Sequence, residues 1–299
     1  MHNEHPQKLE AALYVVATPI GNLRDITLRS LEVLASADVI AAEDKRNTAH
    51  LLTHHQISAN RLMAVHQHNE RGAAEKIIAL LQAGQSVAFV SDAGTPAVSD
   101  PGALLVQAVR SAGLRVIPIP GANAAIAALS AAGLADPHFL FYGFLPNKSA
   151  ARRTALQALS SHPCTLVFYE APHRIVECVS DLCVVLGGER QIVLAREITK
   201  LFETIHACAL QDAEKWLLSD SDQQRGEFVV LVSGAPPQTG LPVETLKTLS
   251  LLLEELPLKQ AVQLAAKISG ANRNELYQHA LQTRKQNHDD GDAQRQDDT

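Results

Sequence analysis

Short apolar runs alternate with longer amphipathic segments along most of the chain, and this alternation restricts the fold more than any other feature. The runs have the length and the Val, Ile and Ala content of buried strands, whereas the segments between them repeat leucine at helical spacing, as at Leu28, Leu31 and Leu34. Strands that alternate with helices build a largely parallel sheet. The predicted strands are residues 13–17, 39–42, 86–90, 116–119, 165–169, 192–195 and 228–233.

The positions of proline and glycine predict where this α/β pattern is divided. With 299 residues the chain is long enough for two domains, and Pro and Gly interrupt it near 141–153 and again at 233–242. The strand signal is lost after the second interruption, and the helical pattern there breaks at Gly270. We expect an N-terminal tail (1–12), two α/β lobes (13–140 and 141–236), a helix-turn-helix-like domain (243–284) and a disordered tail (285–299).

The net charge of −6 disfavours a protein that coats nucleic acid non-specifically, although it leaves room for a local basic surface. Residues 285–299 carry five Asp against one Lys and one Arg, so the folded part is only mildly acidic. No apolar run is long enough to cross a membrane, and the first residues do not resemble a signal peptide. We therefore expect a cytoplasmic protein without a membrane partner.

Several kinds of site lack their sequence signals. The four cysteines show no CxxC spacing, which disfavours a zinc knuckle or a disulfide framework. His66 and His68 would share a strand face, but no third ligand has a clear spacing, so we expect no metal. The chain also lacks GxGxxG, GxxxxGK[ST], GxSxG and HExxH, so a Rossmann dinucleotide site, P-loop chemistry, an esterase triad and a zinc protease are all unsupported.

Polar residues gather where the predicted strands end. The segments that follow them are TPIGN, EDKR, SDAGTP, PGANAA, EAPHR and RE. In open parallel sheets ligands bind beyond the carboxyl ends of the strands, where loops and helix N-termini converge. These loops predict one shared site.

Ordinary turn and capping chemistry would also place Asp, Ser, Gly and Pro after strands. We interpret Asp100 in this way, as the N-cap of a helix with Pro101 at its first position. The charges of Glu43, Asp44 and Arg46 directly after a buried strand indicate either a functional cluster or a structural ion-pair network.

Blocks of sequence along residues 13–284 closely resemble the RsmI family of small-subunit ribosomal RNA 2′-O-methyltransferases. The most specific block is SDAGTPAVSDPG (91–102), and the others include ATPIGNLRD, IPIPGANAAIAAL, FYEAPHRI and AREITKLFET. The resemblance implies the tetrapyrrole methylase fold, in which two α/β/α lobes hold S-adenosylmethionine in the cleft between them. It also implies a homodimer, and a cytidine ribose in the decoding region of 16S rRNA, within the small ribosomal subunit, as the target.

The resemblance also assigns residues to the cofactor. Pro19 and Gly21 would line the cleft, and Asp92, Gly94 and Thr95 would contact the methionine or sulfonium part. The other implied contacts are Asn123, Ala124, Tyr169, Glu170 and Ala171 on the far side, with Gly226 and Glu227 near the adenosine. Within SDAGTPAVSDPG, residues 91–96 would therefore be the cofactor loop and residues 99–102 the cap of the next helix. Two residues, Lys45 and Asn123, differ from those common in related enzymes.

Methyl transfer to a ribose hydroxyl needs alignment of donor and acceptor, and then a proton acceptor or a cation near the developing alkoxide. The candidates are Glu43 and Asp44 as base or orienting groups, with Arg46 or Lys200 as electrostatic support. Phosphate contacts are expected from basic clusters, which are Arg24 with Arg29, Lys148 with Arg152 and Arg153, and Lys259 with Lys267 and Arg273.

Two other functions stay open at this point. A small-molecule methyltransferase acting on a tetrapyrrole would share the S-adenosylmethionine architecture, and a methylation assay comparing 30S subunits with a precorrin would separate the two. A non-catalytic regulator that reads DNA through the C-terminal helices would bind a defined duplex and transfer no methyl group.

Overall fold

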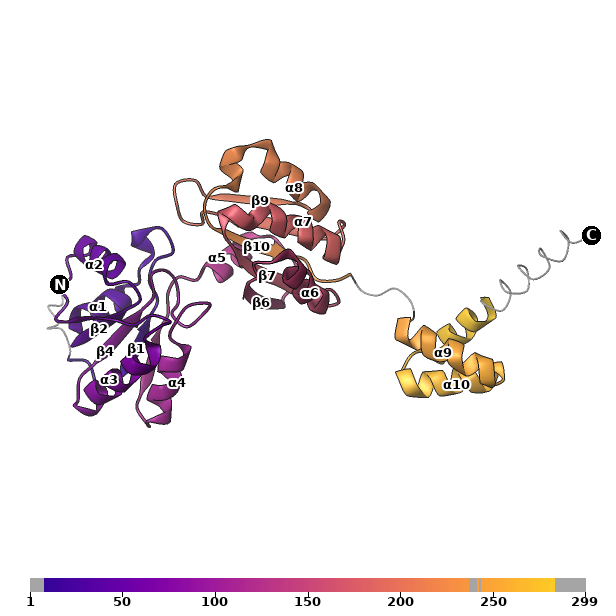
Figure 1. Ribbon diagram of the computed structural model, residues 1–299, viewed down its shortest axis with the longest axis horizontal. Coiled ribbons are helices and arrows are strands. Elements are labelled where there is room, and N and C mark those ends of the chain that lie inside the picture. Colours follow the sequence, from indigo (N-terminus) through magenta and orange to yellow (C-terminus); the bar gives the residue numbers. More distant parts are fainter. Residues whose placement is uncertain (1–7, 237–240, 242, 283–299) are drawn as a thin grey trace, which may run out of the picture. The chain divides into compact units, whose positions relative to one another are not determined.

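The computed structural model describes residues 8–236, 241 and 243–282. The chain divides into two compact units at Ala235 and Pro236 (Figure 1). The first unit holds two α/β lobes, each built on a five-stranded sheet. The second unit is helical. The predicted tails, apart from residues 8–12, and residues 283–284 of the predicted helical domain lie outside the described residues.

The first lobe is a parallel sheet with the order β3-β2-β4-β1-β5 and helices on both faces. Its strands are β1 (Leu13–Val16), β2 (Val39–Ala42), β3 (Leu62–Ala64), β4 (Val87–Val90) and β5 (Val116–Ile119). Its helices are η1 (Leu23–Asp25), α1 (Leu28–Ser36), α2 (Lys45–His54), α3 (Glu70–Gln82) and α4 (Ala103–Ser111).

Alternation along the strands sends neighbouring side chains to opposite faces of this sheet. Val16 and Ile40 pack under α1 and α2, whereas Leu13, Val39 and Phe89 pack under α3 and α4. Because both faces are covered, the strands are continuous apolar runs, which is why the sequence predicts them well.

The second lobe has a mixed sheet with the order β6-β7-β10-β8-β9, in which only the β6–β7 pair is parallel. Its strands are β6 (Phe139–Phe144), β7 (Thr165–Glu170), β8 (Gln191–Arg196), β9 (Thr204–Ala209) and β10 (Phe228–Val232). Its helices are α5 (Ala124–Ala131), α6 (Ser149–Leu159), η2 (Pro172–Arg174), α7 (Ile175–Leu186), α8 (Leu210–Ser219) and η3 (Ser221–Gln224). The expectation of a largely parallel sheet is therefore met in the first lobe and is wrong for the second.

Helices also cover both faces of the second sheet. Helices α6, α7 and α8 pack on one face, and α5 packs its Ala125 and Ala128 against Val167 and Val229 on the other. The predicted division between residues 140 and 141 falls inside β6, and the packing of α5 assigns that helix to the second lobe.

The helical unit contains α9 (Val243–Glu255), α10 (Leu258–Ser269) and a further helix over residues 273–282. Gly270 ends α10 in the left-handed conformation with φ of +70°, so the predicted break at this residue is confirmed. Leu249, Val262 and Leu276 belong to a buried cluster of the unit's own. No helix in the described part of the chain has both the length and the apolar character that crossing a membrane requires.

Candidate active site

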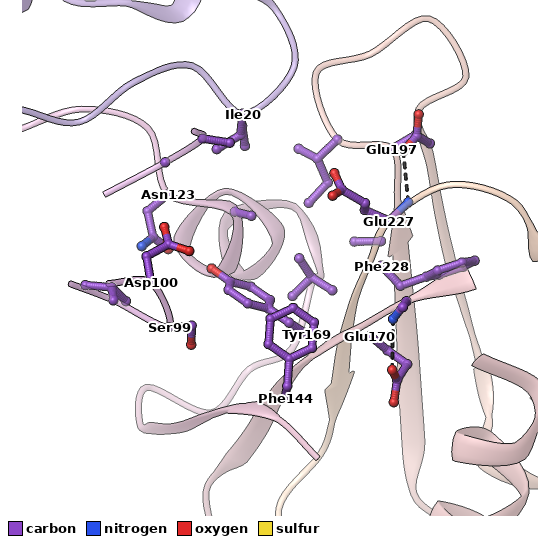
Figure 2. A pocket seen from close by; sticks show the side chains of 18 of the residues that line it. Ile20, Ser99, Asp100, Asn123, Phe144, Tyr169, Glu170, Glu197, Glu227 and Phe228 are labelled. Atoms are coloured by element: carbon purple, nitrogen blue, oxygen red, sulfur yellow. Dashed lines mark hydrogen bonds between the residues drawn. The ribbon is translucent and has the colours of Figure 1, made fainter. Parts of the chain in front are cut away.

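A cavity of about 290 Å³ opens between the two lobes of the first unit (Figure 2). This volume lies near the lower end of the range of roughly 300–1,000 Å³ that is common for small-molecule sites. Its lining comes from both sheets and is formed by Ile20, Ala93–Thr95, Val98–Asp100, Asn123, Ala124, Phe144, Tyr169–Pro172, Ala195, Glu197, Ile198, Lys200 and Glu227–Val229.

Strand direction explains why these segments meet. In the first lobe the loops that follow β1, β4 and β5 leave the same edge, because the strands are parallel. In the second lobe β10 is antiparallel to β7 and β8, and Phe228 pairs with both Glu170 and Arg196. The beginning of β10 therefore lies beside the ends of β7 and β8. Five of the six polar loops meet at this cavity as predicted, whereas the EDKR loop after β2 does not line it. Strand β10 contributes the end at which it begins.

Most residues that the resemblance assigned to the cofactor line this cavity. They are Gly94, Thr95, Asn123, Ala124, Tyr169, Glu170, Ala171 and Glu227, together with Lys200 from the catalytic candidates. The Asn123 side chain also caps α5, because its Oδ1 accepts a hydrogen bond from the Ile126 amide over 3.2 Å. The Tyr169 hydroxyl accepts another from the Ala125 amide over 3.3 Å. The start of α5 is thus fixed against the cavity wall.

Four of the assigned residues lie outside the lining. Pro19 and Asp92 border a smaller neighbouring cavity. Gly21 packs against the 198–200 segment of the second lobe, where a Cβ atom would lie 2.5 Å from Lys200 Cγ. Gly226, with φ of +85°, leaves room for the Glu197 side chain that a Cβ would strike. Both glycines therefore permit close packing behind the cavity wall.

Aromatic rings form one wall. Phe144 and Phe141 each meet Tyr169 edge to face, with ring centroids 5.6 and 5.0 Å apart. Phe144 is 54% exposed, although it is large and apolar. Burial raises the pKa of Tyr169, and the nearby charge of Asp100 raises it further. An exposed ring beside a rigid aromatic pair is suited to contact a flat ligand.

Glu170 and Arg174 fix the loop at the floor of the cavity. The Glu170 carboxylate is buried and lies 3.2 Å from Arg174 Nε, and it also accepts a hydrogen bond from the Ala171 amide over 2.8 Å. Arg174 in turn donates to the Leu145 carbonyl over 2.8 Å and to Asn147. The Glu170 carboxylate is therefore bound by Arg174 and by the Ala171 amide, and it holds the backbone of the cavity lining in position.

Lys200 lies between two carboxylates. Its Nζ is 2.8 Å from both Glu197 Oε1 and Glu227 Oε2. Burial opposes the lysine charge, but the hydrogen bonds to these carboxylates outweigh it, so the pKa of Lys200 is raised. Glu197 also accepts a hydrogen bond from the Glu227 amide over 2.9 Å (Figure 2). The cluster has one positive and two negative charges.

Glu43, Asp44 and Arg46 do not line the cavity. Asp44 caps α2, since its Oδ1 accepts a hydrogen bond from the Arg46 amide over 2.7 Å, and its other oxygen pairs with the Arg46 guanidinium at 3.0 Å. Asp92 accepts hydrogen bonds from the Asp44 amide and from Asn47 Nδ2, each over 3.0 Å, and its own amide donates to Glu43 over 3.3 Å. The charges after β2 thus form a network that joins β2 to the loop after β4.

Asp100 lines the cavity instead of capping a helix, so the interpretation of this residue as an N-cap is wrong. Helix α4 begins at Ala103. The amides of Gly102, just before the helix, and of Leu105, in its first turn, both donate to Glu70 of α3 over 3.0 Å. Burial, with the nearby charges of Glu43 and Asp92, raises the pKa of Asp100 to about 6. Sequence reasoning missed its position because Asp-Pro-Gly is a common helix start and the cap comes from a distant glutamate.

Two cavity loops hold residues in the left-handed backbone region. Ser99 has φ of +62° and Glu197 has φ of +50°, and neighbouring Ala97 and Thr199 share this conformation at +66° and +67°. Non-glycine residues adopt it rarely, at a cost of about 1 kcal/mol or more each. Contacts between the lobes keep these residues in the left-handed conformation. Ser99 lies against Gly143, and Thr199 Oγ1 accepts a hydrogen bond from the Asn22 amide over 3.1 Å.

The apolar lining carries no sequence signal. Ile20, Val98, Ile198 and Phe228 line the cavity, yet an apolar residue near a strand is as readily interpreted as core.

One residue of a predicted basic cluster, Arg152, is not available to RNA. The Arg152 side chain is fully buried, and its Nε pairs with Asp181 at 2.6 Å. Arg153 pairs with the other oxygen of Asp181 at 2.5 Å. The expectation that Arg152 contacts phosphate is wrong, because this guanidinium ties α6 to α7. By contrast, Lys259, Lys267 and Arg273 in the helical unit are exposed.

The described residues contain no cluster of three or more His, Cys, Asp or Glu side chains arranged to hold a metal ion. His66 and His68 lie beyond β3, with ring centroids 6.0 Å apart. Within the same described part, all four cysteines are free thiols, and burial raises the pKa of Cys178.

Comparison with known proteins identifies the class of protein to which this fold belongs. The tetrapyrrole (corrin/porphyrin) methylases match residues 12–214. Among solved structures, a uroporphyrin-III C-methyltransferase from Thermus thermophilus superposes with a TM-score of 0.54 at 22% identity, covering 75% of this chain and 95% of that one. The methyltransferase CobJ gives 0.57 at 22% identity, with 75% and 94% covered. At such identity these likenesses show the fold alone.

Sequence relatives narrow the class. The RsmI C-terminal helix-turn-helix domain matches residues 239–284. The ribosomal RNA small subunit methyltransferase I of Escherichia coli O157:H7 is 52% identical over 91% of this chain and 96% of its own length. That of Pseudomonas aeruginosa is 54% identical over 90% and 96%. The chain belongs to the ribosomal RNA small subunit methyltransferase I family, and it is a methyltransferase that uses S-adenosylmethionine.

Proposed function

We propose that this protein transfers a methyl group from S-adenosylmethionine to the ribose 2′-oxygen of a cytidine in the decoding region of 16S rRNA. The observation that carries the proposal is the acid-rich cavity between the lobes, in a chain similar along 91% of its length to a ribosomal RNA small subunit methyltransferase. The protein would work in the cytoplasm, where small ribosomal subunits are found.

The residues present fit a cationic cofactor. Three carboxylates of the cavity lining, Asp100, Glu197 and Glu227, outnumber its single basic side chain, Lys200, while Arg174 balances the charge of Glu170. A site with excess negative charge favours a ligand that carries a sulfonium and an ammonium group. Gly94, Ala124 and Ala171 keep the lining small where the backbone would contact the ligand.

We assign the two ends of the cavity by their chemistry. Phe144 and Tyr169 would contact the adenine. Glu227 would lie near the adenosine ribose, and Asn123 and Ala124 would also lie beside the adenosine. Gly94, Thr95 and Asp100 would face the methionine and sulfonium end. S-adenosylmethionine supplies an activated methyl group in line for displacement.

The acceptor hydroxyl must lose its proton as its oxygen takes the methyl group. Asp100 suits this step, because it lies in the cavity and has a pKa near neutrality, of about 6. Glu43, one of the two residues predicted as base or orienting group, would support Asp100 by its negative charge. Lys200, the predicted electrostatic support, is already paired with two carboxylates and would instead hold Glu227 beside the adenosine. Asp44 and Arg46 would act on the RNA side as part of the network with Asp92.

The experiment is methylation of 30S subunits that lack the modification, with labelled S-adenosylmethionine, followed by mapping of 2′-O-methyl groups. We expect one modified cytidine in the decoding region and no transfer to a precorrin. Modification of a base, of a different nucleotide or of the precorrin alone would contradict the proposal.

We also propose that the protein is a homodimer. Strand β6 is an edge strand of the second sheet and exposes Phe139 and Tyr142, at 46% and 40%. Apolar edge strands of soluble proteins are usually covered. Light scattering should give twice the chain mass, and Tyr142→Glu should shift the protein towards the monomer. A monomeric wild type would contradict this assignment.

A further inference from the structure

A second cavity, of about 180 Å³, lies in the first lobe beside the proposed cofactor cavity. Its walls are η1, α2 and the loops after β1 and β4, and its lining is formed by Thr18, Pro19, Leu23, Asn47, Thr48, His50, Leu51, Ser91 and Asp92. His55 Nε2 lies 3.2 Å from the Leu23 carbonyl, which holds η1 against the end of α2. This cavity has no part in cofactor binding as proposed above.

The two cavities share one thin wall. Thr18 and Gly94 pair through both of their backbone groups, with the Thr18 amide 2.9 Å from the Gly94 carbonyl and the Gly94 amide 3.0 Å from the Thr18 carbonyl. Residues on either side of this pair divide between the cavities: Pro19 and Asp92 line the second one, whereas Ile20 and Ala93 line the first. Two hydrogen-bonded loop segments therefore separate a group in the second cavity from the proposed cofactor cavity.

The lining of the second cavity can hydrogen-bond a nucleobase. Asp92 holds the Asp44 amide with one oxygen and Asn47 with the other, and each carboxylate oxygen retains a further lone pair. A carboxylate accepts hydrogen bonds from the amino groups of cytosine, adenine or guanine, but it repels a free phosphate. His50 offers an imidazole for stacking, which is a common way of holding an unpaired RNA base.

Exposed basic side chains neighbour the lining residues Leu23 and Asn47 in the sequence. Arg24 on η1 and Lys45 and Arg46 at the start of α2 are exposed, and the Arg46 side chain is 91% exposed. The ion pair between Arg46 and Asp44 is therefore solvated and contributes little stability, so a phosphate can compete for the guanidinium. Phosphate contacts of this kind position an RNA strand without reading its sequence.

We propose that the second cavity binds the base of an RNA nucleotide next to the methylated one, with Arg24 and Arg46 holding the adjacent phosphates. This inference rests on the proposed function, since it assumes an RNA acceptor. The shared wall would then set the distance between the bound nucleotide and the reacting ribose, so that only the neighbouring 2′-oxygen reaches the cofactor.

The test compares steady-state methylation by His50→Ala, Asn47→Ala and Arg24→Ala, with 30S subunits as the varied substrate. The matched controls are Lys76→Ala on α3 and Arg110→Ala on α4, because these exposed basic residues lie on the opposite face of the same sheet. We expect KM for the subunit to rise about tenfold in His50→Ala and Asn47→Ala, in line with the loss of one base contact. S-adenosylmethionine affinity should stay within twofold of the wild type, and the controls should match the wild type.

Filling the cavity gives a second test. Leu23→Trp would place a large ring in this space, and thermal melting with a cofactor titration would verify that the protein still folds. We expect intact cofactor binding and a raised KM for 30S subunits.

Unchanged KM in His50→Ala, Asn47→Ala and Leu23→Trp would overturn the inference while the proposed function stood. The inference would also be overturned if these variants lost cofactor affinity by the same factor as KM for the subunit rises. The second cavity would then only support the wall of the cofactor cavity. If the wild type methylated no 30S subunit, the proposed function itself would fail.

Discussion

Among the side chains that line the proposed cofactor cavity, Asp100 has the pKa that is shifted furthest from its ordinary value. Its pKa of about 6 has three causes, which are burial and the charges of Glu43 and Asp92. In the folded protein without ligand the carboxyl group therefore holds its proton to a higher pH than in the unfolded chain. Ionisation at neutral pH costs folding free energy, and a cationic ligand would offset that cost.

The sign of the effect follows from this shift. The protonated carboxyl contributes stability below its ordinary pKa of 3.8, and that contribution is lost as the pH rises through about 6. Asp100→Asn should therefore raise the free energy of unfolding of the ligand-free protein at pH 8 by about 1 to 2 kcal/mol and leave it nearly unchanged at pH 4. Urea unfolding at both pH values measures this, with exposed Asp25→Asn as the control. Equal stability of wild type and variant at pH 8 would contradict it.

The same substitution should weaken cofactor binding. Wild-type affinity for S-adenosylmethionine should increase from pH 5 to pH 7, because the ionised carboxylate attracts the cation, and Asp100→Asn should bind about tenfold more weakly at pH 7.5 without that dependence. Asp92→Ala alters the loop that the resemblance assigns to the cofactor, but it should have the smaller effect, since Asp92 borders the second cavity. Isothermal titration decides the order, and a greater loss in Asp92→Ala would reverse our assignment.

Among the elements, helix α4 depends on a neighbour for its first turn. Glu70, at the start of α3, is buried and accepts both the Gly102 and the Leu105 amides. One carboxylate oxygen thus replaces the cap that Asp100 does not provide. Helix α4 follows the cavity loop directly, so this bond also fixes the end of that loop.

Glu70→Ala should destabilise the protein by about 2 to 3 kcal/mol, because two amides would lose a charged acceptor in a buried place. Glu75→Ala, on an exposed position of the same helix, should change stability by less than about 0.5 kcal/mol. Chemical unfolding of both variants gives the comparison. Equal stabilities would show that water or another group satisfies these amides.

Elements were predictable where both sides of a strand are buried. Strands such as β2 and β4 are continuous apolar runs and agree with prediction to within a residue. Strands β3, β6 and β9 were missed: β3 has three residues, β6 contains Gly143 at a register shift, and β9 alternates with polar residues at a sheet edge. Strand direction in the second sheet was also missed, because pairing partners far apart in sequence leave no local pattern.

At the scale of the whole molecule, the two units have separate buried cores. The cofactor cavity is lined entirely by residues of the first unit, whereas Lys259, Lys267 and Arg273 are exposed on the second. The candidate site was therefore predictable in its strand-end loops and small residues. It was not predictable in its apolar wall or in the lobe contacts that hold Ser99 and Glu197 in place.

A chain that ends at Ala235 should fold and bind S-adenosylmethionine with wild-type affinity. Its KM for 30S subunits should rise roughly tenfold or more, because the exposed basic side chains of the helical unit would be lost as phosphate contacts. Titration and steady-state methylation measure the two properties separately. Loss of cofactor binding in the shortened chain would show that the units are not independent.

The lobes contact each other through two complementary pairs: Ser99 of the first against Gly143 of the second, and Gly21 of the first against Thr199 and Lys200 of the second. Each pair sets a glycine in one lobe opposite a loop of the other that contains left-handed residues. A chimaera that joined the first lobe of this chain to the second lobe of a distant homologue would disturb both pairs at once. Lobe exchange between such enzymes would therefore yield a working protein only when each glycine is transferred together with the loop it faces.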